Sequence, residues 1–170
     1  MSGPRLASYL SHTECPPTQS DARVARGLVA NASVGINAPI RAVWDALVNP
    51  EVISQYMFGT TVVSEWKKGS PIVWRGTWKG RAYEDRGTIL ELAAEHVLSY
   101  SHYSPLSGLP DVPENYHNVT VKLSQSGKGT TVSLSQDNNP TEEARDHSQR
   151  NWEMMLSGLK KLLEGGQQKG

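Results

Sequence analysis

The longest amphipathic stretch of the chain lies near its C-terminal end and predicts a helix over Pro140–Glu164. Asn139 and Pro140 are typical of a helix start, and Gly165-Gly166 is a stop signal. Between these signals, apolar residues recur at helical spacing: Ala144, Trp152, Met155, Leu156, Leu159, Leu162 and Leu163.

The two halves of this helix differ in polarity. The second half carries only Leu and Met on its stripe, which indicates packing against a hydrophobic core. The first half offers small or polar side chains instead: Ala144, His147, Ser148 and Asn151. Two interpretations stay open, because such a half can cover a cavity or can simply be exposed to solvent.

A strand, two short helices and six further strands are predicted before this helix. Alternating apolar and polar residues predict the strands, and Gly, Pro and Asn residues separate them. The expected strands are Leu28–Ile36, Thr60–Trp66, Pro71–Trp78, Arg81–Leu92, His96–Tyr103, Tyr116–Gln125 and Thr130–Asp137, and the expected helices are Ile40–Val48 and Glu51–Tyr56. This order predicts an α+β fold, in which helices cover one face of an antiparallel sheet.

The turn at Ser126–Gly129 determines which residues of the last two strands face inward. The expected inward residues are His117, Val119, Val121, Leu123, Val132 and Leu134. Val121 then lies opposite Leu134 across the ladder, and Leu123 lies opposite Val132. On this reading, every inward residue of the two strands except His117 is apolar.

Pairing across the Ser104–Glu114 loop places the preceding strand beside this hairpin. His102 is then expected opposite His117, with Leu98 and Tyr100 on the same inner face.

The register becomes ambiguous one strand earlier. A bulge near Ala93-Ala94 would decide whether Ile89 or Leu90 points inward, and the sequence leaves both open. In the hairpin before it, Arg75 is expected to pair with Glu84 across the strands.

The composition indicates a single domain. The chain has 170 residues, equal numbers of acidic and basic residues (17 each), and an isoelectric point near 7.0, which give no sign of a nucleic-acid partner. Met1–Arg26 is rich in Ser, Pro and Thr and predicts a disordered or loosely attached tail, so the domain is expected over residues 27–166. The apolar runs are too short to span a bilayer, and a cytoplasmic protein is predicted. The chain has a single cysteine, Cys15, so no internal disulfide is expected.

Several short motifs, taken in order, resemble the SRPBCC (START-like, birch-pollen-allergen-like) superfamily. They are Val34-Gly35-Ile36-Asn37-Ala38-Pro39, Val43-Trp44-Asp45-Ala46-Leu47, Asn49-Pro50-Glu51, Trp66 before Lys68-Gly69-Ser70, the Trp78-to-Gly87 hairpin, Ile89-Leu90-Glu91, Leu98-Ser99-Tyr100 and Asn151-Trp152. The branch that they resemble is that of bacterial proteins similar to the activator of heat-shock-protein-90 ATPase. The resemblance covers about Leu28 to Leu163. The order in which the motifs occur, rather than any single motif, makes the resemblance specific.

This resemblance implies a helix-grip fold, with a seven-stranded antiparallel sheet curled around the C-terminal helix and a cavity between them. The chain departs from the family pattern at Ala93-Ala94, where a proline is common, and in its long Ser104–Glu114 loop, which is expected to affect the cavity mouth. The family shares no catalytic constellation, so the resemblance assigns no catalytic residue.

His102 and His117 are the candidate polar site. Two facing histidines on adjacent strands can share a metal ion, bind a ligand carboxylate or transfer protons. A metal ion would need a third ligand, and the sequence does not settle whether Asp85 or Glu84 faces the pair. The alternative is that both histidines have only structural hydrogen bonds at a cavity rim.

Aromatic and aliphatic side chains provide the candidate cavity wall. Four aromatic residues could form a pocket or could be ordinary sheet packing: Trp74, Trp78, Tyr83 and Tyr100. The rest of the expected ligand-binding set is Val119, Val121, Leu134, Ser148, Trp152 and Met155, together with the two histidines.

These observations predict a non-enzymatic protein that binds a small apolar or amphipathic molecule, such as a lipid, without a metal or another cofactor. The ligand is expected to enter apolar end first and to place acceptor oxygens near the histidines. A stress-response or co-chaperone role is a second class, against which the absence of the eukaryotic activator's N-terminal domain argues. A third class is a cyclase-like or hydrolase-like cavity enzyme that uses His102 and His117. A homodimer is compatible with all three.

Overall fold

The computed structural model describes residues 27–167 of the chain. The predicted N-terminal tail, with Cys15, lies outside these residues. The described elements are β1 (Leu28–Ile36), α2 (Ile40–Val48), α3 (Pro50–Tyr56), β2 (Thr61–Ser64), β3 (Pro71–Trp78), β4 (Arg81–Ala93), β5 (Val97–His102), the 3-10 turns η1 (Pro105–Ser107) and η2 (Pro113–Asn115), β6 (His117–Ser126), β7 (Gly129–Asn139) and α4 (Glu142–Gln167).

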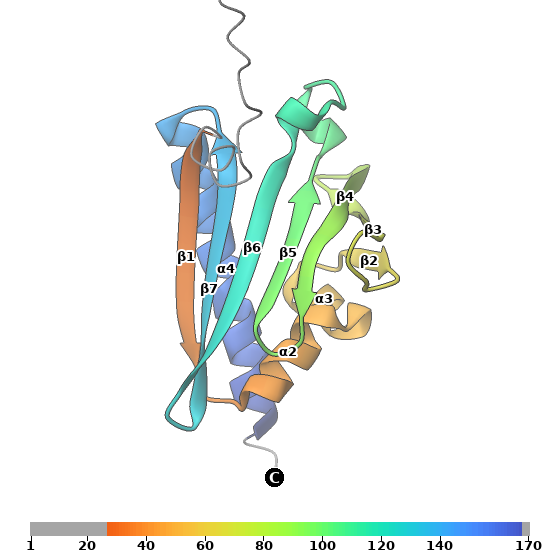
Figure 1. Cartoon of the computed structure of the whole chain (residues 1–170). Coiled ribbons are helices and arrows are strands. Elements are labelled where there is room, and N and C mark those ends of the chain that lie inside the picture. The colour runs from red at the N-terminus through yellow and green to blue at the C-terminus, as the bar shows by residue number, and fades with distance from the viewer. Residues whose placement is uncertain (1–26, 168–170) are drawn as a thin grey trace, which may run out of the picture.

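The strands form one seven-stranded antiparallel sheet in the order β1-β7-β6-β5-β4-β3-β2. Helix α4 runs behind the sheet beside β1 and β7, α2 lies at the lower end of the sheet against β6 and β7, and α3 lies beside β2 (Figure 1). Helix α3 packs against both β2 and α4, so helices close the inner face of the sheet from two sides. The predicted α+β helix-grip fold is confirmed.

The hydrophobic core fills the space between the inner face of the sheet and these helices. Fully buried residues come from each side: Ile36, Val43, Ile72, Ile89, Val119, Val132, Leu156 and Leu159. The core residues on α4 belong to its second half, as the Leu and Met stripe predicts. The pairings of Val121 with Leu134, of Leu123 with Val132 and of His102 with His117 are confirmed.

A bulge in β4 resolves the register that the sequence left open. Ile89 pairs with Tyr100 and Glu91 pairs with Ser99, so Leu90 is the extra residue. Ile89 therefore points into the core and is fully buried, while Leu90 is 39% exposed. The bulge lies earlier in the strand than the expected position near Ala93-Ala94.

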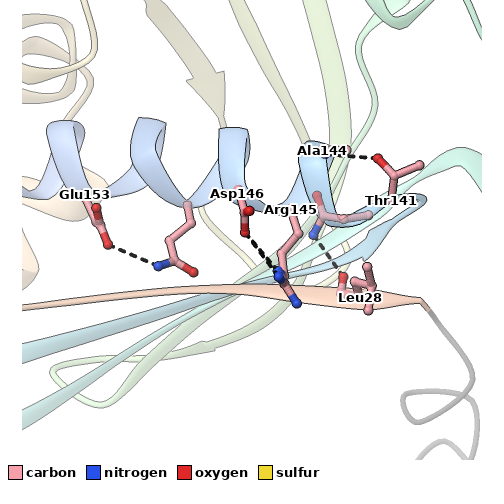
Figure 2. A network of polar contacts seen from close by, with 8 residues as sticks. Leu28, Thr141, Ala144, Arg145, Asp146 and Glu153 are labelled. Carbon is pink, nitrogen blue, oxygen red and sulfur yellow. Dashed lines mark hydrogen bonds and ion pairs between the residues drawn. The ribbon is translucent and has the colours of Figure 1, made fainter.

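The expected limits of the last helix are wrong at both ends. Asn139 is the last residue of β7, where its side-chain amide donates to the Leu28 carbonyl at 2.9 Å. Thr141 begins the helix instead, because its Oγ1 accepts from the Ala144 amide at 3.1 Å (Figure 2). The helix also continues past the expected stop at Gly165-Gly166 and ends at Gln167.

The long β5–β6 connection is held to the outer end of β5. The Tyr103 hydroxyl donates to the Leu109 carbonyl at 2.7 Å, and the Tyr103 ring stacks on Tyr116. Arg86 pairs with Asp111 at 3.2 Å. No residue of this connection lines the cavity described below, so its expected effect on the cavity mouth is not found among the described residues.

Candidate functional site

A cavity of about 160 Å³ lies between the inner face of the sheet and the first half of α4. Five neighbouring strands, α4 and the turn between α3 and β2 all contribute to its wall. The lining residues are Met57, Thr60, Trp74, Tyr83, Asp85, Tyr100, His102, His117, Gln136 and Trp152. The polar first half of the helix therefore covers a cavity through Trp152, while His147 and Asn151 are exposed to solvent.

Strand alternation explains why Asp85 faces this cavity. Arg75 pairs with Glu84 as predicted, and their side chains meet at 2.7 Å on the exposed side of the hairpin. The next pair is Trp74 with Asp85, which must point to the opposite face. The orientation of Asp85 could therefore have been derived from the predicted Arg75–Glu84 pairing.

Each of the two histidines has a hydrogen-bond partner within the protein. His102 Nε2 and Asp85 Oδ2 lie 2.9 Å apart, so Nε2 carries the proton that the carboxylate accepts. His117 Nδ1 donates to the Asp137 carbonyl at 2.8 Å. The two rings stack with centroids 6.4 Å apart, and Trp74 meets His102 edge-on. The arrangement agrees with the structural interpretation of the pair and adds Asp85 to it.

Gln136 holds Trp152 over the cavity. The Gln136 amide nitrogen donates to Asn139 and Ser148, which leaves its Oε1 to accept the hydrogen bond from the Trp152 indole. The expectation that His117 is the one polar inward residue of the last two strands is therefore wrong. The alternation of Val132 and Leu134 continues to Gln136, and this pattern could have revealed it.

Two polar groups on the cavity wall have unused hydrogen-bonding capacity. Asp85 Oδ1 is enclosed and has no hydrogen-bond partner among residues 27–167. The Tyr100 hydroxyl also makes no hydrogen bond within this part of the chain, whereas the Tyr56 hydroxyl donates to the Ala46 carbonyl at 2.9 Å. Burial raises the pKa of Tyr100 well above its usual range, so its hydroxyl stays protonated and can donate.

The apolar part of the expected binding wall is closely packed. Val121, Leu134 and Met155 surround a second space of only about 40 Å³, which shares Met57, Trp74 and Tyr100 with the main cavity. Val119 is 1% exposed and lines neither space. The sequence predicted an apolar cavity with one polar end, and the larger of the two spaces lies at that polar end.

Trp78 and Ser148 lie outside the cavity. Trp78 is 57% exposed at the end of the β3–β4 hairpin, where Lys79 Nζ lies over its ring, so its expected place beside Trp74 in an aromatic pocket is wrong. Trp74 and Trp78 share a face of β3, but Trp78 is the last residue of the strand and is exposed. Ser148 is connected to the cavity wall through Gln136. Its hydroxyl accepts a hydrogen bond from the Gln136 amide and donates to Asn139 at 3.1 Å.

Thr60 and Tyr83 form the remaining polar contact of the wall. Their hydroxyls lie 2.7 Å apart. The Tyr83 ring lies across Gly76, where an added Cβ would come within 2.6 Å of the Tyr83 hydroxyl oxygen. Met57 lies in a turn without periodicity, whereas Thr60 begins the expected strand Thr60–Trp66, in which alternation with the buried Val62 points it inward.

Among the described residues, no group of three or more His, Cys, Asp or Glu side chains is placed to hold a metal ion. Within the same part of the chain, no helix is both long and apolar enough to cross a membrane.

Comparisons with known proteins give one family match and several solved structures. Residues 37–164 match the family model described as Activator of Hsp90 ATPase homolog 1-like protein. The solution structure of a Cytophaga hutchinsonii protein is 60% identical, with a TM-score of 0.73 over 82% of this chain and 95% of that chain. No curated protein matches the chain.

More distant structures share the fold at lower identity. The solution structure of the Aha1 dimer from Colwellia psychrerythraea is 18% identical, with a TM-score of 0.64 over 81% of this chain and 96% of that chain. The crystal structure of DynU16, from the dynemicin biosynthetic locus, is 16% identical, with a TM-score of 0.68 over 81% of this chain and 48% of that chain.

Proposed function

The chain belongs to the Activator of Hsp90 ATPase homolog 1-like protein family, and we propose that it binds, without chemical conversion, a small ring-sized molecule with apolar faces and one polar edge. The predicted family is thereby confirmed. The observation that carries the proposal is the pairing of aromatic walls with unused polar groups. Tyr100 and Asp85 have hydrogen-bonding capacity that the described part of the protein does not use, and Trp74 and Trp152 line the same space.

The size of the cavity limits the ligand. An apolar cavity of about 150 Å³ accommodates benzene, and the cavity beneath Trp152 has about 160 Å³. One aromatic ring with a short substituent therefore fits without rearrangement. A long acyl chain would require the close-packed residues around the second space to move apart, which argues against the lipid ligand that the sequence suggested.

Binding is favoured over covalent catalysis because the polar groups lack an activated nucleophile. The Asp85–His102 contact orients one imidazole, but no Ser, Cys or Lys side chain of residues 27–167 lines the cavity beside it. The hydroxyls present belong to Tyr100, whose pKa burial raises, and to the Thr60–Tyr83 pair.

Titration with phenol is expected to give saturable binding in the millimolar range, about −4 kcal/mol. The tryptophan indole N–H signals in ¹⁵N–¹H spectra report on position. Trp74 and Trp152 line the cavity and should shift, whereas the exposed Trp78 should not. Equal shifts at all three, or no saturation, would argue against a specific site in this cavity.

A second test compares two buried tyrosines. Tyr100→Phe removes a hydroxyl without a partner among the described residues, so the free energy of unfolding should change little while phenol affinity falls. Tyr56→Phe removes the bond to Ala46 and should cost about 1 kcal/mol of stability with phenol affinity nearly unchanged. Urea denaturation and the same titration measure both, and unchanged phenol affinity in Tyr100→Phe would remove this hydroxyl from the proposed site.

The roles named for the relatives are roles of those proteins. The family description names an ATPase activator and the Colwellia title names a dimer. The cavity favours neither role for this chain, so a chaperone partner and a homodimer both stay predictions from the sequence.

A further inference from the structure

The Asp85 carboxylate offers more acceptor sites than the protein uses. An ionised carboxylate has about four lone-pair sites. His102 Nε2 occupies one of them, at Oδ2, and Oδ1 has no partner among the described residues. The Asp85 side chain is 14% exposed, so bulk water does little to satisfy it. A buried acceptor without a donor is destabilising, and a ligand donor would remove that cost.

The charge of the cavity wall selects against anions. Within the described part of the chain, Asp85 is the sole carboxylate among the lining residues, and none of them is Lys or Arg. The arginines of neighbouring positions are engaged outside the cavity, since Arg75 pairs with Glu84 and Arg86 pairs with Asp111. A ligand carboxylate would therefore approach Asp85 without a permanent cation to compensate it.

The aromatic residues of the wall complement a flat donor-bearing ligand. The Trp74 and Tyr100 rings have centroids 5.0 Å apart, and Trp152 lines the same cavity from α4. Aromatic faces attract cations as well as other rings. A planar molecule that carries its donor in the ring plane can lie against these residues and reach the carboxylate at one edge.

We infer that the cavity selects a single-ring aromatic molecule that carries an N–H donor and is neutral or cationic, and that Asp85 is the residue that determines this selectivity. The inference rests on the proposed function, because it names the ligand class of the same cavity. It reverses the sequence-based expectation that acceptor oxygens of the ligand would lie near the histidines.

A donor can reach Asp85 in two ways. It can use the second lone pair of Oδ2, or the carboxylate can rotate so that Oδ1 faces the cavity. The terminal torsion of an aspartate is broad, so such a rotation costs little. His102 can remain hydrogen-bonded to the carboxylate in both cases.

Benzamidine and benzoate test the inference, because they have nearly the same shape and opposite charge. The wild-type protein is titrated with each, and with neutral benzamide, while the Trp152 indole signal is followed. Benzamidine should bind at least tenfold more tightly than benzoate, with benzamide between them. Asp85→Asn should weaken benzamidine binding at least tenfold. Glu84→Gln is the matched control on the exposed side of the same strand and should bind like the wild type.

The outcomes separate this inference from the proposed function. If benzoate binds as tightly as benzamidine, or if Asp85→Asn leaves benzamidine affinity unchanged, the selectivity is wrong while saturable phenol binding still supports a ring-sized cavity. If phenol also fails to bind, the proposed function fails with it. The wild-type ratio of benzamidine to benzoate does not depend on the folding of any variant, so the inference stays testable if Asp85→Asn is unstable.

Discussion

Gly87→Ala is expected to lower the free energy of unfolding by about 3 kcal/mol. A Cβ at this position would lie 1.7 Å from the Ser101 carbonyl oxygen, which is a backbone atom and cannot rotate away. Gly87 lies between Arg86, which bonds Tyr103 of the next segment, and the fully buried Ile89. Strands β4 and β5 would have to separate between these fixed contacts, next to Asp85 and His102.

Gly35→Ala is the matched control, because it adds the same methyl group to a strand glycine with no atom within 4 Å of the new Cβ. Its stability should change by less than about 0.5 kcal/mol. Urea denaturation measures both variants, and phenol titration shows whether the strand separation also disturbs the cavity. Equal stabilities of the two alanine variants would mean that β4 and β5 can separate freely at this point.

Most of the fold follows from periodicity and turn chemistry. The Ser126–Gly129 turn determined the register of the last hairpin, and pairing across the Ser104–Glu114 loop then placed His102 opposite His117. The order of elements was enough to identify the helix grip. Local signals were less reliable at the ends of α4, where the Asn139 side chain bonds a distant strand and a paired glycine does not stop the helix.

The candidate site was predicted in part, because its residues depend on tertiary contacts. Of the ligand-binding residues named from the sequence, those that line this cavity are Trp74, Tyr83, Tyr100, His102, His117 and Trp152. Gln136 was missed although the alternation of β7 points it inward, because the inward positions were followed only as far as Leu134. The size of the cavity could not be predicted, since it depends on how closely Met155 and its neighbours pack.

Leu159→Ala and Trp152→Ala are expected to separate the two roles of α4. Leu159 is fully buried in the apolar half of the helix, so its truncation should cost about 2–5 kcal/mol. Trp152 is partly exposed and borders the cavity, and its indole makes one hydrogen bond, to Gln136. Its truncation also removes packing against the core, but beside space that water can enter, so it should cost less than the roughly 3–5 kcal/mol typical of a core tryptophan.

Ligand binding should show the opposite order. Trp152→Ala removes part of the cavity wall, so phenol affinity should fall strongly, whereas Leu159→Ala should retain it under conditions where the variant is folded. Met154→Ala controls for substitution on the same helix, because Met154 is 55% exposed and should change stability by less than about 0.5 kcal/mol. Urea denaturation and phenol titration of the three variants measure both properties. Equal, large destabilisation by the first two with unchanged phenol binding would show that the binding site does not extend to Trp152. In that case α4 would serve the core along its whole length.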